Sequence, residues 1–212
     1  MLKFIPVLFF IFISLSCHQP ADSISPRLSK NDKNRTQSKN VSFNPFDKLK
    51  DYGQIIKQKK LNIQYVFVVD YSLHSGKKRL YLIDILKHKI VRKMMVAHGS
   101  KSETKMGYAT DFSNVSESNK SSLGYAIVNS RAYSRWGIHI KYWLDGINKS
   151  NSNMRKRVMV LHSYKLVPGF ETYPLPIVTS LGCVMLSKED MKFIDSLIKK
   201  QHNKRLLMYI RA

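Results

Sequence analysis

The chain is poor in cysteine and in acidic residues. Among its 212 residues only Cys17 and Cys183 are cysteines, and no zinc-finger spacing or other nucleic-acid signature occurs. Asp and Glu number 14 against 36 Lys and Arg, which gives a formal net charge of +22. The basic residues are spread over the whole chain, so the charge indicates anionic surroundings without naming them. An anionic cell wall, anionic lipid headgroups and nucleic acid would all attract a protein of this charge.

The apolar run at the N-terminus is too short to span a bilayer permanently. It extends from Phe4 to Ile13, follows a lysine and precedes a stretch of small residues that ends at Cys17. This order predicts a secretory signal over residues 1–17. Leu15-Ser16-Cys17 also resembles a degenerate bacterial lipoprotein box, although Ser14 stands where leucine is usual. Plain cleavage, lipid attachment at Cys17 and an uncleaved helix are the three alternatives.

Export has consequences for partners and for Cys183. We expect a periplasmic or cell-envelope protein, in contact with the anionic envelope and, if Cys17 is lipidated, anchored to a membrane. Nucleic acid is not an expected partner. If Cys17 is lipidated or removed, Cys183 is the only thiol left in a compartment where cysteines normally pair. Such a thiol is either reactive or a small buried hydrophobe.

The rest of the chain divides into a tether and one domain. Residues 18–49 are rich in Ser, Asn, Lys and Gln and predict a flexible polar tether, whereas residues 50–212 are long enough for one domain with a core. The apolar patterns predict strands over residues 65–71, 79–85, 89–97, 125–128 and 158–162, the first three of them forming a β-meander, and helices over 47–59 and 188–200. Ser187 and Asp190 form a capping box for the last helix. The fold class is mixed, β-rich α+β.

Chemistry is concentrated around one histidine and one cysteine. An apolar strand delivers His162-Ser163, and Ser180-Leu181-Gly182-Cys183 follows before the last helix. A thiol needs a nearby imidazole to take its proton, and a third group must fix the imidazole tautomer. His162 suits the first role, and Ser163 suits the second through its carbonyl or hydroxyl. Gly182 leaves the backbone bare, so the N–H groups of the Gly-Cys turn can form an oxyanion hole.

Four separated segments carry a resemblance to a known family. The histidine followed by a [S/T]-x-G-C motif resembles the signature of YkuD-type L,D-transpeptidases, with Leu181 where the best-known members have histidine. Three further segments are similar to a branch with a murein L,D-transpeptidase catalytic domain: Val96-Ala97-His98-Gly99-Ser100, Phe112-Ser113-Asn114 and Ser121-Ser122-Leu123-Gly124. The resemblance covers about residues 66–186.

The resemblance implies a β-sandwich or barrel with short flanking helices, no metal and no cofactor. It implies acyl transfer on peptidoglycan stem peptides, in which Cys183 attacks the carbonyl of the third-position diamino acid and expels the terminal D-alanine. His162 would protonate the leaving amine and then deprotonate the acceptor amine. The arginine or asparagine often found two places after the catalytic cysteine is Met185 here. The stem carboxylate therefore needs another partner.

Several residues remain candidates for substrate binding, each with a structural alternative. Arg155 and Arg157 are candidates for the stem carboxylate or are solvated surface charges. His98 lines the cleft or is a structural histidine. Ser121 and Ser122 bind substrate polar groups or form a turn. The aromatic residues near the site are core or cleft wall: Trp136, Tyr142 and Trp143.

Two alternatives to a transpeptidase remain open at this stage. An L,D-carboxypeptidase would use the same residues with water as the acceptor. A non-catalytic, wall-binding lipoprotein would keep the fold and use its basic surface, with Cys183 inert.

Overall fold

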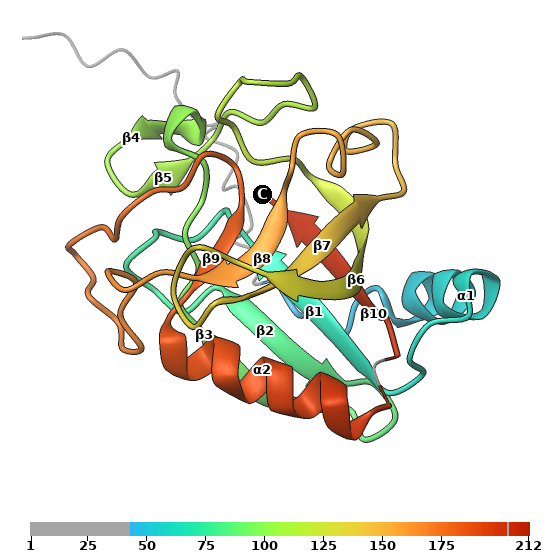
Figure 1. Cartoon of the computed structure of the whole chain (residues 1–212). Coiled ribbons are helices and arrows are strands. Elements are labelled where there is room, and N and C mark those ends of the chain that lie inside the picture. Colours follow the sequence, from blue (N-terminus) through green and yellow to red (C-terminus); the bar gives the residue numbers. More distant parts are fainter. Residues whose placement is uncertain (1–42, 203) are drawn as a thin grey trace, which may run out of the picture. The chain divides into compact units, whose positions relative to one another are not determined.

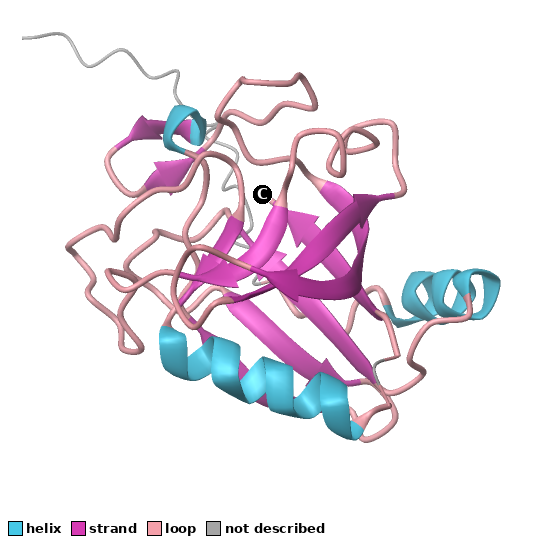
Figure 2. Ribbon diagram, viewed as in Figure 1, coloured by secondary structure: helices cyan, strands magenta, loops and turns pink. Residues whose placement is uncertain are grey.

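One curled sheet and two helices form the framework of the described chain, and loops connect them (Figure 1, Figure 2). The computed structural model describes residues 43–202 and 204–212. The predicted leader, the predicted lipidation site Cys17 and the predicted tether up to residue 42 lie outside the described residues. Phe43 and Phe46, at the start of the described part, pack against the cluster of apolar side chains beneath the first helix.

The described residues form two α-helices, one short 3-10 helix and ten strands. The helices are α1 (Leu49–Lys59) and α2 (Lys188–Lys200), with a short 3-10 helix at Ser100–Ser102. The strands are β1 (Tyr65–Asp70), β2 (Leu80–Asp84), β3 (Lys89–Met94), β4 (Glu103–Lys105), β5 (Tyr108–Ala109), β6 (Gly124–Tyr133), β7 (Ile140–Gly146), β8 (Val160–Ser163), β9 (Val184–Leu186) and β10 (Leu206–Arg211). No helix among the described residues is long and apolar enough to cross a membrane.

The main sheet has eight strands in the order β3-β2-β1-β10-β6-β7-β8-β9. Strands β1, β2 and β3 are antiparallel neighbours, which confirms the predicted meander. Only β1 with β10 and β8 with β9 run parallel in this sheet. A separate pair, β4 with β5, follows the short 3-10 helix. The predicted mixed, β-rich α+β fold is therefore confirmed.

The sheet curls until the chain after β3 meets β9. Ala97 forms an antiparallel bridge with Met185, and Gly99 forms a parallel bridge with Ser180. The Ala97 N–H donates to the Met185 carbonyl at 2.9 Å, and the Ser180 N–H donates to the His98 carbonyl at 2.8 Å. These contacts join the two ends of the strand order, so the sheet approaches a closed barrel.

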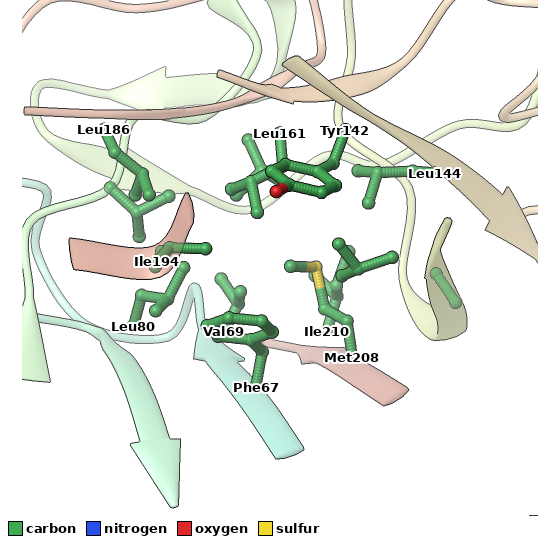
Figure 3. Close-up of a cluster of buried hydrophobic side chains, with 14 of the residues drawn as sticks. Phe67, Val69, Leu80, Tyr142, Leu144, Leu161, Leu186, Ile194, Met208 and Ile210 are labelled. Carbon is green, nitrogen blue, oxygen red and sulfur yellow. The ribbon is translucent and has the colours of Figure 1, made fainter. Parts of the chain in front are cut away.

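Alternate side chains of the central strands enter two cores. Phe67 and Val69 of β1 belong to the large core, while Val66 and Val68 belong to a second core under α1. Figure 3 shows side chains from β1, β2 and β10 facing side chains from β7, β8 and β9, with Ile194 of α2 beside them. Because a strand alternates faces, one five-residue apolar run serves both cores.

Three predicted strands differ from the structure by more than one residue at an end. The strand expected over 125–128 continues to Tyr133. The run expected over 89–97 ends as a strand at Met94, because residues 95–99 leave β2 and approach β9. The strand expected from 158 begins at Val160, because Val158 has φ 56°, outside the extended region. Strands β4, β5, β7, β9 and β10 were not predicted. In β10 the apolar residues do not alternate with polar ones, because both faces are covered.

We predict that Ser187→Ala destabilises the protein by about 1 kcal/mol. The Ser187 hydroxyl accepts the Asp190 N–H at 3.1 Å at the start of α2, as the capping box predicted. Urea unfolding measures the change. Ser196→Ala, in an exposed position of the same helix, is the control and should change stability little. Equal effects of the two substitutions would contradict a capping role.

Candidate functional site

The turn that carries Cys183 is fixed by a glycine and a serine. Gly182 has φ 114°, a conformation that L side chains rarely adopt, and a Cβ there would lie 2.9 Å from the Lys120 carbonyl oxygen. The Ser180 hydroxyl accepts the Gly182 N–H at 3.1 Å and donates to the Cys183 carbonyl at 2.8 Å. Ser180 therefore holds the turn, and the Gly182 N–H is engaged within it.

His162 is held by the strand next to this turn. It lies in β8, opposite Met185 of β9, and is buried. Its Nδ1 lies 3.1 Å from the Ser163 carbonyl oxygen, so Nδ1 carries the proton and Nε2 is left as the basic nitrogen. The Ser163 hydroxyl accepts the Ile138 N–H at 3.1 Å instead. Of the two predicted ways for Ser163 to orient the imidazole, the geometry uses the carbonyl.

Cys183 and His162 line one hollow of about 330 Å³, which we call the cysteine hollow. Its walls are mostly uncharged, and they include Trp136, Tyr164, Leu181 and Met185. Trp136 contacts Tyr164 edge to face, with ring centroids 5.7 Å apart. Of the predicted aromatic cluster, Trp136 is thus a cleft wall. Tyr142 is fully buried, and Trp143 packs under the cations of Lys141 and Arg155.

The thiol rests against the backbone of the loop before β8. Cys183 Sγ lies 3.8 Å from the Val158 carbonyl oxygen, which accepts the thiol proton. Val158 is β-branched and has φ 56°, a strained conformation that directs this carbonyl. Within residues 43–202 and 204–212 no hydrogen bond joins Sγ to His162. Catalytic hydrogen bonds are often long before substrate binds, so this arrangement is compatible with a nucleophile and its base.

Both groups are neutral in this resting arrangement. Burial lowers the pKa of His162, and Lys141 lowers it further, against the opposing effect of the Ser163 carbonyl. Burial raises the pKa of the Cys183 thiol, although a hydrogen bond from the Val160 backbone and the charges of Arg157 and Lys141 oppose the rise. A neutral imidazole is able to accept the thiol proton when a substrate arrives.

Arg157 fastens the loop of residues 113–122 beside the Cys183 turn. Its Nη1 donates to the Ser113 carbonyl and to the Ser122 hydroxyl, both at 2.6 Å. Its Nη2 donates to the Ser118 hydroxyl at 3.0 Å and to the Lys120 carbonyl at 2.6 Å. The terminal nitrogens are thus occupied by the protein, and the guanidinium acts on the site through its charge.

Arg155 and the two serines lie outside the cysteine hollow. Arg155 forms a two-point ion pair with Asp145, with N–O distances of 2.5 and 2.9 Å. The Ser121 hydroxyl accepts the Gly99 N–H at 2.9 Å, and the Ser122 hydroxyl donates to the Ser113 carbonyl at 2.7 Å. Both serines are almost fully buried. Their contacts serve the framework behind the turn.

His98 belongs to a buried network that sequence reasoning did not identify. Arg79, fully buried, donates to His98 Nδ1 at 2.6 Å, so Nε2 carries the proton and donates to Glu103 at 3.0 Å. Burial, with the charge of Arg79, lowers the pKa of His98 to about 3. The sequence signal for this network was an arginine, Arg79, at the start of an apolar strand. Among residues 43–202 and 204–212, no three His, Cys, Asp or Glu side chains gather as a metal site.

We predict that acid weakens the fold through His98. Its folded pKa is about 3 against an ordinary 6.5, so between these values the unfolded chain binds a proton that the folded chain does not. The stability that neutral His98 contributes is therefore present above pH 6.5 and is lost as the pH falls toward 3. Between pH 7 and pH 5 the free energy of unfolding should fall by about 2 kcal/mol more in the wild type than in His98→Gln. Urea unfolding at the two pH values measures both. Parallel losses in the two proteins would contradict this role of His98.

Comparisons with solved structures found similar chains at low sequence identity. The structure resembles the helical cell shape determining protein Pgp2 from Campylobacter jejuni, at 12% identity and TM-score 0.41, covering 70% of this chain and 47% of that one. It also resembles an L,D-transpeptidase from Mycobacterium smegmatis, at 11% identity and TM-score 0.42, covering 70% and 59%. This chain thus spans about half the length of Pgp2. No curated protein matched the sequence.

The family model is decisive because it covers most of the chain. A model described as L,D-transpeptidase catalytic domain matches residues 37–209. The match includes the turn with Cys183, the strand with His162 and the segment with His98. The resemblance inferred from the sequence motifs is confirmed. This chain belongs to the L,D-transpeptidase catalytic domain family.

Proposed function

We propose that this protein is an exported cysteine acyltransferase that acts on peptidoglycan stem peptides. The observation that carries the proposal is that Cys183 and His162 line one hollow, with Nδ1 of His162 bound to the Ser163 carbonyl. This is the arrangement of a nucleophile, its base and a group that orients the base. Family membership supports peptidoglycan as the substrate.

Acylation begins from the neutral thiol and imidazole. His162 Nε2 accepts the thiol proton while Cys183 Sγ attacks the carbonyl of the third-position diamino acid. The Gly182 N–H is bound to Ser180, so the Cys183 N–H is the turn donor that we assign to the tetrahedral oxyanion. His162 then gives its proton to the amine of the terminal D-alanine, which leaves. The product is a thioester at Cys183.

Deacylation repeats these steps in reverse order. An acceptor amine attacks the thioester carbonyl while His162 takes its proton, and the proton returns to the departing Cys183 thiolate. An amine of a second stem peptide gives a cross-link. Water in place of the amine gives a shortened peptide, which is the carboxypeptidase outcome.

Export and envelope contact belong to the same proposal. The charged, apolar and small-residue zones of residues 1–17 support secretion, and Cys17 is the position that we propose for a lipid anchor. The net charge of +22 supports attraction to an anionic envelope. The site of action would then be the periplasm or the cell surface.

We predict that the full-length protein converts a disaccharide tetrapeptide in a Cys183-dependent reaction, identified by mass spectrometry. A cross-linked dimer establishes transpeptidation, and a tripeptide establishes carboxypeptidase activity. Cys183→Ala should abolish the product, and His162→Gln should slow its formation at least about 100-fold, because general base catalysis is lost. Lys192→Gln on α2 is the control and should leave the rate unchanged. Product formation by Cys183→Ala, or none by the wild type, would contradict the proposal.

A further inference from the structure

An apolar hollow lies beside the C-terminal end of α1. It has a volume of about 470 Å³, and its lining shares no residue with the cysteine hollow. Apart from Gly53, Lys57 and Lys60 the lining is aliphatic, and it contains no acidic residue. Figure 1 shows α1 well apart from β9, the strand that follows Cys183. No step of the acyl transfer uses this surface.

Two large aliphatic side chains at this hollow are exposed to solvent. Ile63 is 65% exposed and Leu86 is 63% exposed, and both line the hollow. A single exposed aliphatic side chain is common on protein surfaces and needs no explanation. Two of them that adjoin one apolar hollow indicate instead a surface that another molecule covers.

Hydrogen bonds fix the turns that expose these two side chains. Oδ1 of Asn62, which is buried, accepts the two backbone N–H groups that follow Ile63, each at 2.9 Å. Oδ1 of Asp84, also buried, accepts the N–H of Leu86 at 3.1 Å and that of the next residue at 2.9 Å. The side chain of Gln64 donates to Asp84 at 2.6 Å, which joins the two turns. The two aliphatic side chains are therefore exposed as fixed parts of the fold.

Lysines surround the two aliphatic side chains. Lys57 and Lys60 line the hollow, and Lys59 and Lys87 are sequence neighbours of lining residues. All four are exposed, and none forms an ion pair within the described part of the chain. The carboxylate of Asp84 is buried and is occupied by the turn. The surface is therefore cationic as well as apolar.

This combination fits an anionic bilayer surface better than it fits other partners. Aliphatic side chains enter the headgroup region while lysine ammonium groups reach the lipid phosphates, and neither contact needs a partner of fixed shape. A second copy of this chain would bring its own lysines against these, and contacts between like charges are unfavourable. An anionic wall polymer would attract the lysines but would leave Ile63 and Leu86 in water.

The N-terminal segment joins the described domain next to this surface. Phe46 stacks on His88 with ring centroids 5.9 Å apart, and His88 directly follows Lys87. An anchor at Cys17, which is part of the proposed function, and this surface are thus able to engage one membrane together. Two linked contacts bind more tightly than either contact alone.

We propose that this surface of the domain docks on the anionic lipid headgroups of a membrane. The surface, which we call the α1 patch, consists of Lys57, Lys60, Ile63, Leu86 and Lys87. The two aliphatic side chains enter the interface, and the three lysines bind lipid phosphates. The docking goes beyond acyl transfer and does not depend on it, and it leaves the cysteine hollow open to substrate.

Fluorescence quenching by lipid tests the contact at the patch itself. Full-length protein carrying Leu86→Trp is mixed with vesicles of equal parts phosphatidylglycerol and phosphatidylcholine whose acyl chains are brominated. The new fluorescence should be quenched, after the unsubstituted protein has been used to correct for Trp136 and Trp143. Met106→Trp is the matched control and should not be quenched, because Met106 is 73% exposed beside Lys105 but lies in the turn between β4 and β5.

Removal of charge tests the lysines. In the Leu86→Trp protein, a change of all three patch lysines to Gln should raise the lipid concentration for half-maximal quenching at least about tenfold. The matched control changes Lys188, Lys192 and Lys200 of α2 to Gln, which removes the same charge from another exposed surface. It should raise this concentration less than about twofold, because charges far from the membrane are screened by salt. Vesicles of phosphatidylcholine alone should quench little.

Three results of these experiments would overturn the docking proposal. They are an absence of quenching with the anionic vesicles, equal quenching of Leu86→Trp and Met106→Trp, and equal effects of the two lysine triples. The last result would assign the binding to net charge alone. A dimer that forms without vesicles and that Ile63→Ser dissociates, measured by analytical ultracentrifugation, would assign the patch to a second copy and would also overturn the proposal.

Discussion

The site depends on two backbone bridges that close the curled sheet. Ala97 with Met185 and Gly99 with Ser180 join the segment after β3 to the segment that carries Cys183. Without them the contacts that attach the Cys183 turn would be reduced to the short pairing of β9 with β8 and the bond from Cys183 Sγ to Val158, among the described residues. The bridges place the turn beside His162 on one side and beside the Arg157-bound loop on the other. The contacts that close the sheet thus also position the site.

Charged groups near the Cys183 turn are of two kinds, those packed behind it and those exposed to solvent. Behind it, Arg79, neutral His98 and Glu103 form a fixed chain whose backbone also receives the Ser180 N–H. Glu117 and Lys156, by contrast, are exposed and line a separate hollow. The buried chain stabilises one position of the turn, because a buried polar network is costly to leave unsatisfied.

The sequence predicted the family, the meander and the capped last helix, because each has a local signal. Each signal is contained in a few consecutive residues: the apolar run of β1, the Ser187 cap, the motif around His162 and the motif around Cys183. The role of Arg79 was not predictable, because it donates to His98, which in turn donates to Glu103, and the fold brings these segments together. The same applies to Glu117 and Lys156, which are separated by 39 positions and line one hollow in the folded chain. Val158 shows the converse, since a strong strand former adopts φ 56° at the site.

The central claim is that Cys183 becomes acylated with His162 as the base. Intact-protein mass spectrometry after brief mixing with a tetrapeptide donor, followed by peptide mapping, measures this directly. The account predicts a thioester on the peptide that contains Cys183, formed with loss of D-alanine and formed far more slowly in His162→Gln. An adduct at another residue, or a Cys183 that stays unmodified while product accumulates, would contradict it.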